Sequence, residues 1–112
     1  MQLTQKHCIP CENGDPAITD ENEELFHKQV PDWLLLRDGT HRIRRQFNLK
    51  TFTNAIAFVN KIAEVAEKEE HHPDIYIFYN KVQIDLFTHA VGGLSENDFI
   101  LAAKIDEIVS KL

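Results

Sequence analysis

The stretch that decides the fold is residues 51–73, "TFTNAIAFVNKIAEVAEKEEHHP". Apolar side chains recur there at steps of three and four, which is the period of an amphipathic helix. Thr51 is a suitable N-cap and Pro73 cannot continue a helix, so we expect one helix over residues 51–70. The side chains expected to face inward are Phe52, Ile56, Val59, Ile62, Ala63 and Ala66.

A strand hairpin is predicted on each side of this helix. Before it, Asp38-Gly39 is a type I′ turn signal inside "WLLLRDGTHRIRRQFNL", residues 33–49. After it, residues 75–79 and 82–89 form two strands joined at Asn80-Lys81. Val82, Ile84 and Leu86 share one face of the second strand. The charged run "HRIRR" is expected to be a solvated face, although Arg45 falls in the apolar row.

Two further helices complete the pattern. The first starts at Thr19 or Asp20 and ends before Pro31, with Leu25, Phe26 and Val30 inward. The last follows the N-cap Ser95, with Leu94 and Phe99 spaced as a hydrophobic staple. Its inward residues are Leu101, Ile105, Ile108 and Leu112.

The resulting order, α-β-β-α-β-β-α, predicts an α+β fold. We expect a four-stranded, mainly antiparallel sheet with three helices packed on one face, formed by residues 19–112. Residues 1–18 show no period and are expected to be an N-terminal arm. Trp33 is expected to be a core or interface anchor.

Composition narrows the classes of function. A chain of 112 residues is one domain, and a formal net charge of −6 argues against nucleic-acid binding. No apolar run approaches the roughly 20 residues that a membrane span needs, and the polar start is not typical of a signal peptide. We therefore expect a cytoplasmic protein that binds neither membrane nor nucleic acid.

Three histidines are candidates for proton transfer. His71 and His72 lie at the junction between helix and strand, and the hairpin that follows returns His89 towards them. Imidazole titrates near neutral pH, and Glu67 precedes His71 by one turn and could orient it. The alternative is that exposed imidazoles only compensate the helix dipole. Consecutive extended residues point to opposite sides, so a zinc site there is not expected.

The only cysteines, Cys8 and Cys11, lie in the motif "HCIPC". A structural zinc site needs four ligands, and a thioredoxin-type site needs a preceding strand. Free thiols in an arm that is dispensable for chemistry are the favoured interpretation, and a metal shared between subunits stays open.

Residues 66–106, "AEKEEHHPDIYIFYNKVQIDLFTHAVGGLSENDFILAAKID", resemble the pterin-4a-carbinolamine dehydratase (4a-hydroxytetrahydrobiopterin dehydratase) family. The shared elements, in order, are the acidic helix end, His-His-Pro, "YNKV", Thr-His, "GLS" and an aspartate. The "RDG…RQF" hairpin and the long helix extend the resemblance over residues 18–112. Two positions depart from the family pattern: Ile75 stands where tryptophan is frequent, and Ala90 where an acidic residue is.

The resemblance implies a hydro-lyase of tetrahydrobiopterin recycling, which converts 4a-hydroxytetrahydropterin to quinonoid dihydropterin without a cofactor or metal. It implies His71, His72 and His89 as catalytic residues, and Glu67, Pro73 and Thr88 as substrate-binding residues. Which histidine is the acid and which the base is left open. Asp98 matches a family aspartate, but Ser95-x-x-Asp98 has the form of a capping box, so a supporting role is expected.

The family also implies a homodimer or homotetramer with two-fold symmetry. Some relatives act as dimerisation cofactors for a transcription factor, so a non-catalytic protein-binding module is the alternative function. Intact histidines favour the enzyme, because a scaffold has no chemical need for them.

Overall fold

The helix expected over residues 51–70 is present as α2 (Phe52–Glu69), and Thr51 caps it by accepting a hydrogen bond from the Asn54 amide at 3.0 Å. The structure is a computed structural model that describes residues 2–112. The buried side chains of α2 are Ala55, Phe58, Ile62, Ala66 and Glu69. Phe52 is 50% exposed and Ala63 is exposed, so the predicted inward face was wrong at both positions.

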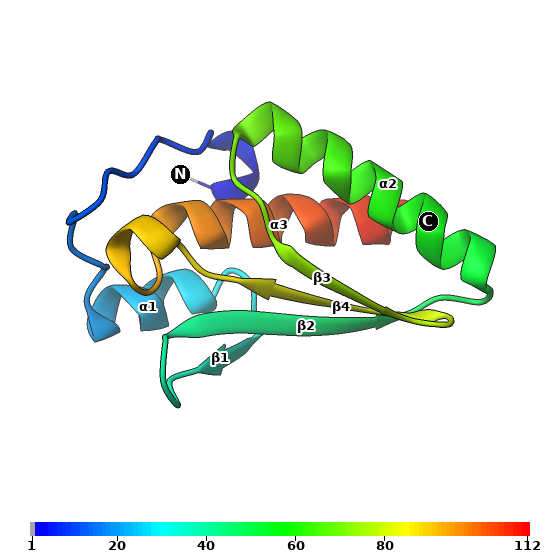
Figure 1. Cartoon of the computed structure of the whole chain (residues 1–112), viewed down its shortest axis with the longest axis horizontal. Helices are drawn as coiled ribbons and strands as arrows, with labels where there is room; N and C mark the ends of the chain where they lie inside the picture. Colours follow the sequence, from blue (N-terminus) through cyan, green and yellow to red (C-terminus); the bar gives the residue numbers. More distant parts are fainter. Residues whose placement is uncertain (1) are drawn as a thin grey trace.

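Four antiparallel strands form one sheet, in the order β1-β2-β4-β3. Their bounds are β1 (Leu34–Leu36), β2 (Arg42–Asn48), β3 (Asp74–Phe78) and β4 (Lys81–Leu86). The buried apolar row predicted on the last strand is confirmed, because Val82, Ile84 and Leu86 are fully buried. Helices α2 and α3 (Glu96–Ser110) cover one face of this sheet (Figure 1), which confirms the α+β order.

The first hairpin closes differently from the expected two-residue turn. Five residues, Arg37 to His41, separate β1 from β2, and within this loop only Gly39 has a positive φ, of 82°. A type I′ turn needs positive φ at both central residues, so that prediction was wrong. The loop is tied to α1 (Asp20–His27) instead, because Arg37 Nε donates to Glu23 Oε1 at 2.9 Å.

The outer helices begin where predicted, with Thr19 and Ser95 as N-caps. Leu25 of α1 is 58% exposed and Leu112 is 61% exposed, so neither faces the core as expected. Leu112 lies beyond the end of α3, which explains its exposure. Leu94 and Phe99 are both fully buried, as the predicted staple requires.

The arginines of "HRIRR" are not a solvated face. Arg44 makes a two-pronged ion pair with Asp85, at 2.7 and 2.8 Å. Arg45 lies over the Phe47 ring at 4.6 Å and donates to Asp106 of α3 at 2.7 Å. Pairing with these buried or half-buried carboxylates explains how an arginine can stand in the apolar row.

The arm lies against the folded domain. Leu3, in the short 3₁₀ helix η1 (Leu3–Gln5), is 2% exposed and belongs to the core. From there the arm passes the end of α2 and the start of α3, as Figure 1 shows in blue. None of the helices in residues 2–112 is both long and apolar enough to cross a membrane.

Candidate active site

His71 is placed by the way α2 ends. Glu70 adopts a left-handed conformation (φ 53°, ψ 37°), and the His71 amide donates back to Ala66 O at 3.2 Å. This terminates the helix and turns the His71 side chain inward, where it is 12% exposed. Its Nε2 lies 2.6 Å from Oδ1 of Asp98.

Asp98 is the centre of a small hydrogen-bond network. It is completely buried, and its Oδ2 accepts from the Ser95 amide at 3.0 Å and from Thr88 Oγ1 at 2.8 Å. The capping box predicted from Ser95-x-x-Asp98 is therefore present. The carboxylate does more than cap, because its other oxygen binds His71.

The His71–Asp98 contact fixes which imidazole nitrogen carries a proton. A carboxylate can only accept, so Nε2 donates to it and Nδ1 is the nitrogen left for a ligand. Every fully buried side-chain nitrogen or oxygen within the described residues has a partner. Nδ1 of His71 makes no hydrogen bond within the described residues, so it is not fully buried, and His71 lines the cavity described next.

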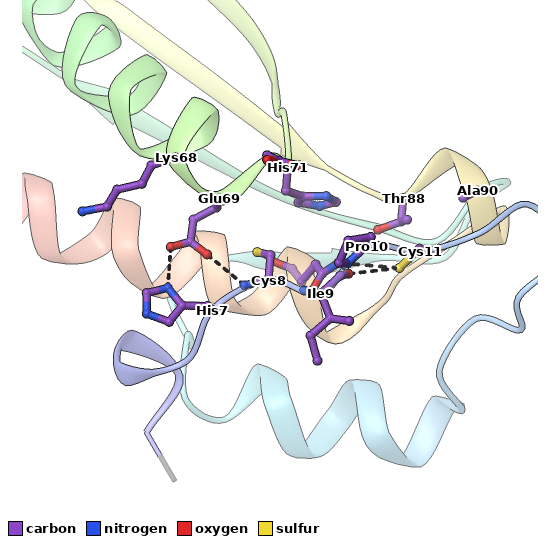
Figure 2. Close-up of a pocket in the computed structure, with 12 residues that line it drawn as sticks. His7, Cys8, Ile9, Pro10, Cys11, Lys68, Glu69, His71, Thr88 and Ala90 are labelled. Carbon is purple, nitrogen blue, oxygen red and sulfur yellow. Dashed lines mark hydrogen bonds and ion pairs between the residues drawn. The ribbon is translucent and has the colours of Figure 1, made fainter.

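That cavity has a volume of about 500 Å³ and is lined by four parts of the chain. The end of α2, the segment after β4, the start of α3 and the N-terminal arm all contribute. The lining residues are His7, Cys8, Ile9, Pro10, Cys11, Lys68, Glu69, Glu70, His71, Thr88, Ala90 and Asn97. Figure 2 shows His71 and Thr88 on one side of the space and the arm passing along the other.

Glu69 joins the arm to the cavity rim. Its Oε1 accepts from the Cys8 amide at 2.8 Å, and its Oε2 lies 3.0 Å from His7 Nδ1 and 3.3 Å from Lys104 Nζ. Burial pushes the pKa of this carboxyl upward, but the Cys8, His7 and Lys104 contacts outweigh it and hold the pKa below its usual value. Glu69 is therefore a fixed negative group at neutral pH.

The other residues implied by the family resemblance lie outside the cavity lining. His72 is 61% exposed and its Nε2 lies 2.8 Å from Oε1 of the exposed Glu67. His89 begins the 3₁₀ helix η2 (His89–Val91), is exposed, and packs against Phe87 with ring centroids 4.4 Å apart. Pro73 is half-buried. The structure thus joins His71 with Thr88 and Asp98, and His72 with Glu67, as two separate groups.

Sequence reasoning missed the cavity residues supplied by the arm and by the start of α3. The motif "HCIPC" has too few ligands for a zinc site and no preceding strand for a redox site, so its spacing alone does not indicate a cavity wall. Asn97 gave no signal at all, since an asparagine next to a capping aspartate is unremarkable.

One potential metal group is found among the described residues, and it lies away from these histidines. Asp20, Glu23 and His41 bring their ligand atoms within 4.8 Å of one another. Both Glu23 oxygens already have partners, Arg37 Nε at 2.9 Å and His41 Nδ1 at 2.8 Å. The group is explained as a structural link between α1 and the first hairpin.

Fold and site together define an α+β protein with a carboxylate-bound histidine at the wall of a cavity. The family model for pterin 4 alpha carbinolamine dehydratase matches residues 16–108. The chain therefore belongs to the pterin-4a-carbinolamine dehydratase family.

Relatives match over nearly the whole chain. A protein of Halorhodospira halophila, named provisionally as a pterin-4-alpha-carbinolamine dehydratase, is 44% identical over 108 residues, covering 96% of this chain and 98% of its own. A Rubrobacter xylanophilus protein with the same provisional name is 39% identical over 107 residues, with the same two coverages.

Solved structures share the fold. A transcriptional coactivator/pterin dehydratase from Brucella melitensis has a TM-score of 0.77 and 30% identity, covering 82% of this chain and 97% of that one. A pterin dehydratase-like protein identified as a RuBisCO assembly factor in the alpha-carboxysome has a TM-score of 0.59 at 20% identity, covering 69% of this chain and 88% of that one. The second likeness concerns the fold alone.

Proposed function

We propose that this protein dehydrates 4a-hydroxytetrahydropterin to quinonoid dihydropterin, as a hydro-lyase of tetrahydrobiopterin recycling. The observation that carries the proposal is the 2.6 Å contact between His71 and buried Asp98 at the wall of a cavity of about 500 Å³. This volume is in the range of small-molecule sites. Family membership supplies the substrate class, and the site supplies a group able to move its protons.

The reaction needs one acid and one base. The bond between C4a and the hydroxyl oxygen breaks, the hydroxyl takes up a proton and leaves as water, and N5 loses its proton as the C4a=N5 double bond forms. Nothing is oxidised or reduced, so the protein has only to orient the ring and exchange protons.

His71 is the residue we assign to one of these proton transfers. With Nε2–H donating to Asp98, Nδ1 accepts a proton when the imidazole is neutral and gives one when it is charged. Thr88 lines the same cavity and keeps the Asp98 carboxylate in place by donating to it.

His72 and His89 are proposed as the remaining catalytic histidines, with Glu67 and Pro73 as substrate contacts. Glu67 is bonded to His72 at 2.8 Å, so it is suited to orient that ring. The exposed ring of His89 is free to approach a ligand that extends beyond the cavity. The pH profiles of kcat in the single variants will decide which of His71 and His89 is the acid and which is the base.

The direct test is a stopped-flow assay of carbinolamine dehydration with purified protein, run beside His71→Ala prepared identically. We expect acceleration over buffer without added metal or nucleotide, unaffected by a chelator, and strongly reduced in the variant. A wild-type rate equal to that of buffer would contradict the proposal.

A second candidate is a protein-binding module, and the edge strand β3 favours it. Tyr76, Phe78 and Tyr79 are 44%, 55% and 70% exposed on or just beyond this strand. An apolar edge strand invites pairing with another chain. A dehydration rate that saturates with substrate concentration would favour the enzyme. A folded chain without this activity would favour the protein-binding module.

The same edge leads us to propose a homo-oligomer with two-fold symmetry, either a dimer or a tetramer. Light scattering at micromolar concentration tests this, and a monomer there would refute it. The cytoplasmic location expected from the sequence stays a prediction.

A further inference from the structure

The N-terminal residues 7–11, here termed the wall segment, supply five of the cavity's lining residues. This segment precedes residues 16–108, which the family model matches. In Figure 2 the segment runs along the cavity on the side opposite His71 and Thr88. It closes a space that would otherwise open to solvent beside the histidine.

Asn97 holds the wall segment through a pair of hydrogen bonds to the backbone of Ile9, like the paired bonds between neighbouring strands. The Ile9 amide donates to Asn97 Oδ1 at 2.9 Å, and Asn97 Nδ2 donates back to Ile9 O at 2.6 Å. Asn97 is buried, so both bonds are partly buried although the Ile9 side chain is exposed. One side chain therefore satisfies both backbone groups of Ile9, which is a specific anchor and not a chance surface contact.

A second anchor lies one residue earlier. The Cys8 amide donates to the buried carboxylate of Glu69 at 2.8 Å, and the Cys8 thiol lies 3.6 Å from Asn97 O. Hydrogen bonds to an ionised acceptor are stronger than neutral ones. With anchors at Cys8 and Ile9, the backbone position of the wall segment is fixed from both α2 and α3.

The thiol of Cys8 is not suited to be a nucleophile. Burial, with the negative charges of Glu69 and Asp98 adding to it, raises the pKa of Cys8 to about 12. A neutral thiol reacts slowly, so this cysteine behaves as a small apolar group. It packs against the hydrophobic core and lines the cavity.

The wall segment lines the cavity without filling it. The volume of about 500 Å³ is what remains with residues 7–11 in place. A plug would have consumed that space, so an autoinhibitory role does not fit.

We propose that the wall segment is the outer wall of the pterin site and that Asn97 is the residue that positions it. Pro10 and Cys11 then contact the bound pterin from the side opposite His71, and Asn97, which also lines the cavity, holds the segment in place. The inference rests on the proposed function for the identity of the ligand. It replaces the expectation, drawn from the sequence, that the arm is dispensable for chemistry.

The first experiment uses the wild-type chain and requires no turnover. Cys11 is half-buried at the cavity, so its alkylation by iodoacetamide can be followed by mass spectrometry with and without 7,8-dihydropterin. We expect bound dihydropterin to slow alkylation of Cys11 by about 5-fold or more, the residual rate reflecting the unliganded fraction. Dihydropterin that binds, shown by calorimetry, yet leaves the Cys11 rate unchanged overturns the proposal.

The second experiment separates binding from chemistry. Cys11→Phe places a bulky ring on the wall, and Glu12→Phe makes the same change at the exposed neighbour that does not line the cavity. We expect Cys11→Phe to raise KM about 10-fold with kcat within 2-fold of wild type, and Glu12→Phe to change neither.

Asn97→Ala tests the anchor, with the exposed Asn60→Ala on α2 as its matched control. Asn97→Ala should raise KM about 5-fold or more, keep kcat, and speed amide exchange of Cys8 and Ile9, while Asn60→Ala does none of these. A loss of kcat at unchanged KM would show that Asn97 serves His71 and Asp98 instead, and would overturn the wall assignment. If Asn97→Ala fails to fold, the Cys11→Phe and Glu12→Phe pair decides alone.

These outcomes distinguish the two proposals. Normal dehydration with no protection of Cys11 and unchanged KM in Cys11→Phe overturns the wall and leaves the dehydratase intact. Protection of Cys11 in a protein that binds dihydropterin but does not dehydrate the carbinolamine overturns the dehydratase and supports the wall. Absence of any pterin binding overturns both.

Discussion

Replacing Asp98 by asparagine separates its capping role from its role towards His71. Oδ2 of Asp98 accepts two hydrogen bonds, from the Ser95 amide and from Thr88 Oγ1, so the oxygen of an asparagine must take over that side. The new NH₂ group then faces His71 Nε2 in place of an oxygen. An NH₂ group can only donate, so Nε2 must become the acceptor and the proton must move to Nδ1.

The expected effects on stability and on rate differ greatly in size. Two hydrogen bonds to a carboxylate become bonds to a neutral amide, which costs about 1 kcal/mol each and about 2 kcal/mol together. The wrong tautomer, in contrast, removes the acceptor at Nδ1 and should lower kcat by about 10²–10⁴. We therefore expect a folded but nearly inactive protein, whereas a role in capping alone would predict mainly a loss of stability.

The assay is single-turnover dehydration together with thermal unfolding followed by circular dichroism. Thr51→Ala is the matched control, because it removes the N-cap of α2, costs about 1 kcal/mol, and touches nothing in the cavity. It should lower Tm while keeping kcat. Asp98→Asn with kcat within 3-fold of wild type in a folded protein would refute the tautomer argument and return Asp98 to capping alone.

Three further predictions concern the histidines, the core and the arm. His71→Ala and His89→Ala should each lower kcat by about 10² if each is a general acid–base group, and an unchanged kcat in either excludes that residue. Trp33→Phe removes the 2.8 Å bond from the indole to Asp106 and should cost about 1 kcal/mol in urea unfolding, with no change in KM. Because the folded-state pKa of Glu69 is lowered, its stabilisation is present above its unfolded pKa of about 4.3 and is lost as pH falls through the folded value. Tm should therefore fall less between pH 7 and pH 3.5 in Glu69→Gln than in wild type, and equal falls would contradict the assignment.

Element order and the two strand hairpins could be predicted because they depend on local signals, whereas the long-range pairing of β2 with β4 was not predicted. Thr19, Thr51 and Ser95 are the N-caps of the three α-helices in the described residues, and the alternation of Val82, Ile84 and Leu86 set the inward face of β4. Such signals act within a few residues, so they survive in any tertiary context.

The inward face of α2 was predicted correctly at Ile62 and Ala66 but not along the whole helix, because the helix carries two overlapping apolar stripes. The predicted stripe began at Phe52, whereas the buried one runs through Ala55, Phe58 and Ile62. Periodicity shows that both stripes are helical, but which one meets the sheet depends on partners far along the chain. In the other stripe Phe52 is 50% exposed, whereas Val59 still packs against the core.

The arm was unpredictable for a related reason. Its anchors, Glu69 and Asn97, lie about 60 and 90 residues away in the sequence, with separations of 61 for Cys8–Glu69 and 88 for Ile9–Asn97. Neither half of such a pair shows a period or a motif on its own. Only the fold, by bringing the end of α2 beside the start of α3, gives "HCIPC" a surface on which to lie.

The first turn of α3 links the two halves of the proposed site. Asp98 binds His71, and its neighbour Asn97 binds Ile9 of the wall segment. Successive residues of a helix point about 100° apart, so one rigid turn can hold the imidazole on one side and the wall on another. The distance between the His71 imidazole and the wall segment is then set by the geometry of the α3 helix, not by two flexible loops. This explains why a capping box is useful here beyond stability: fixing the start of α3 fixes the width of the cavity.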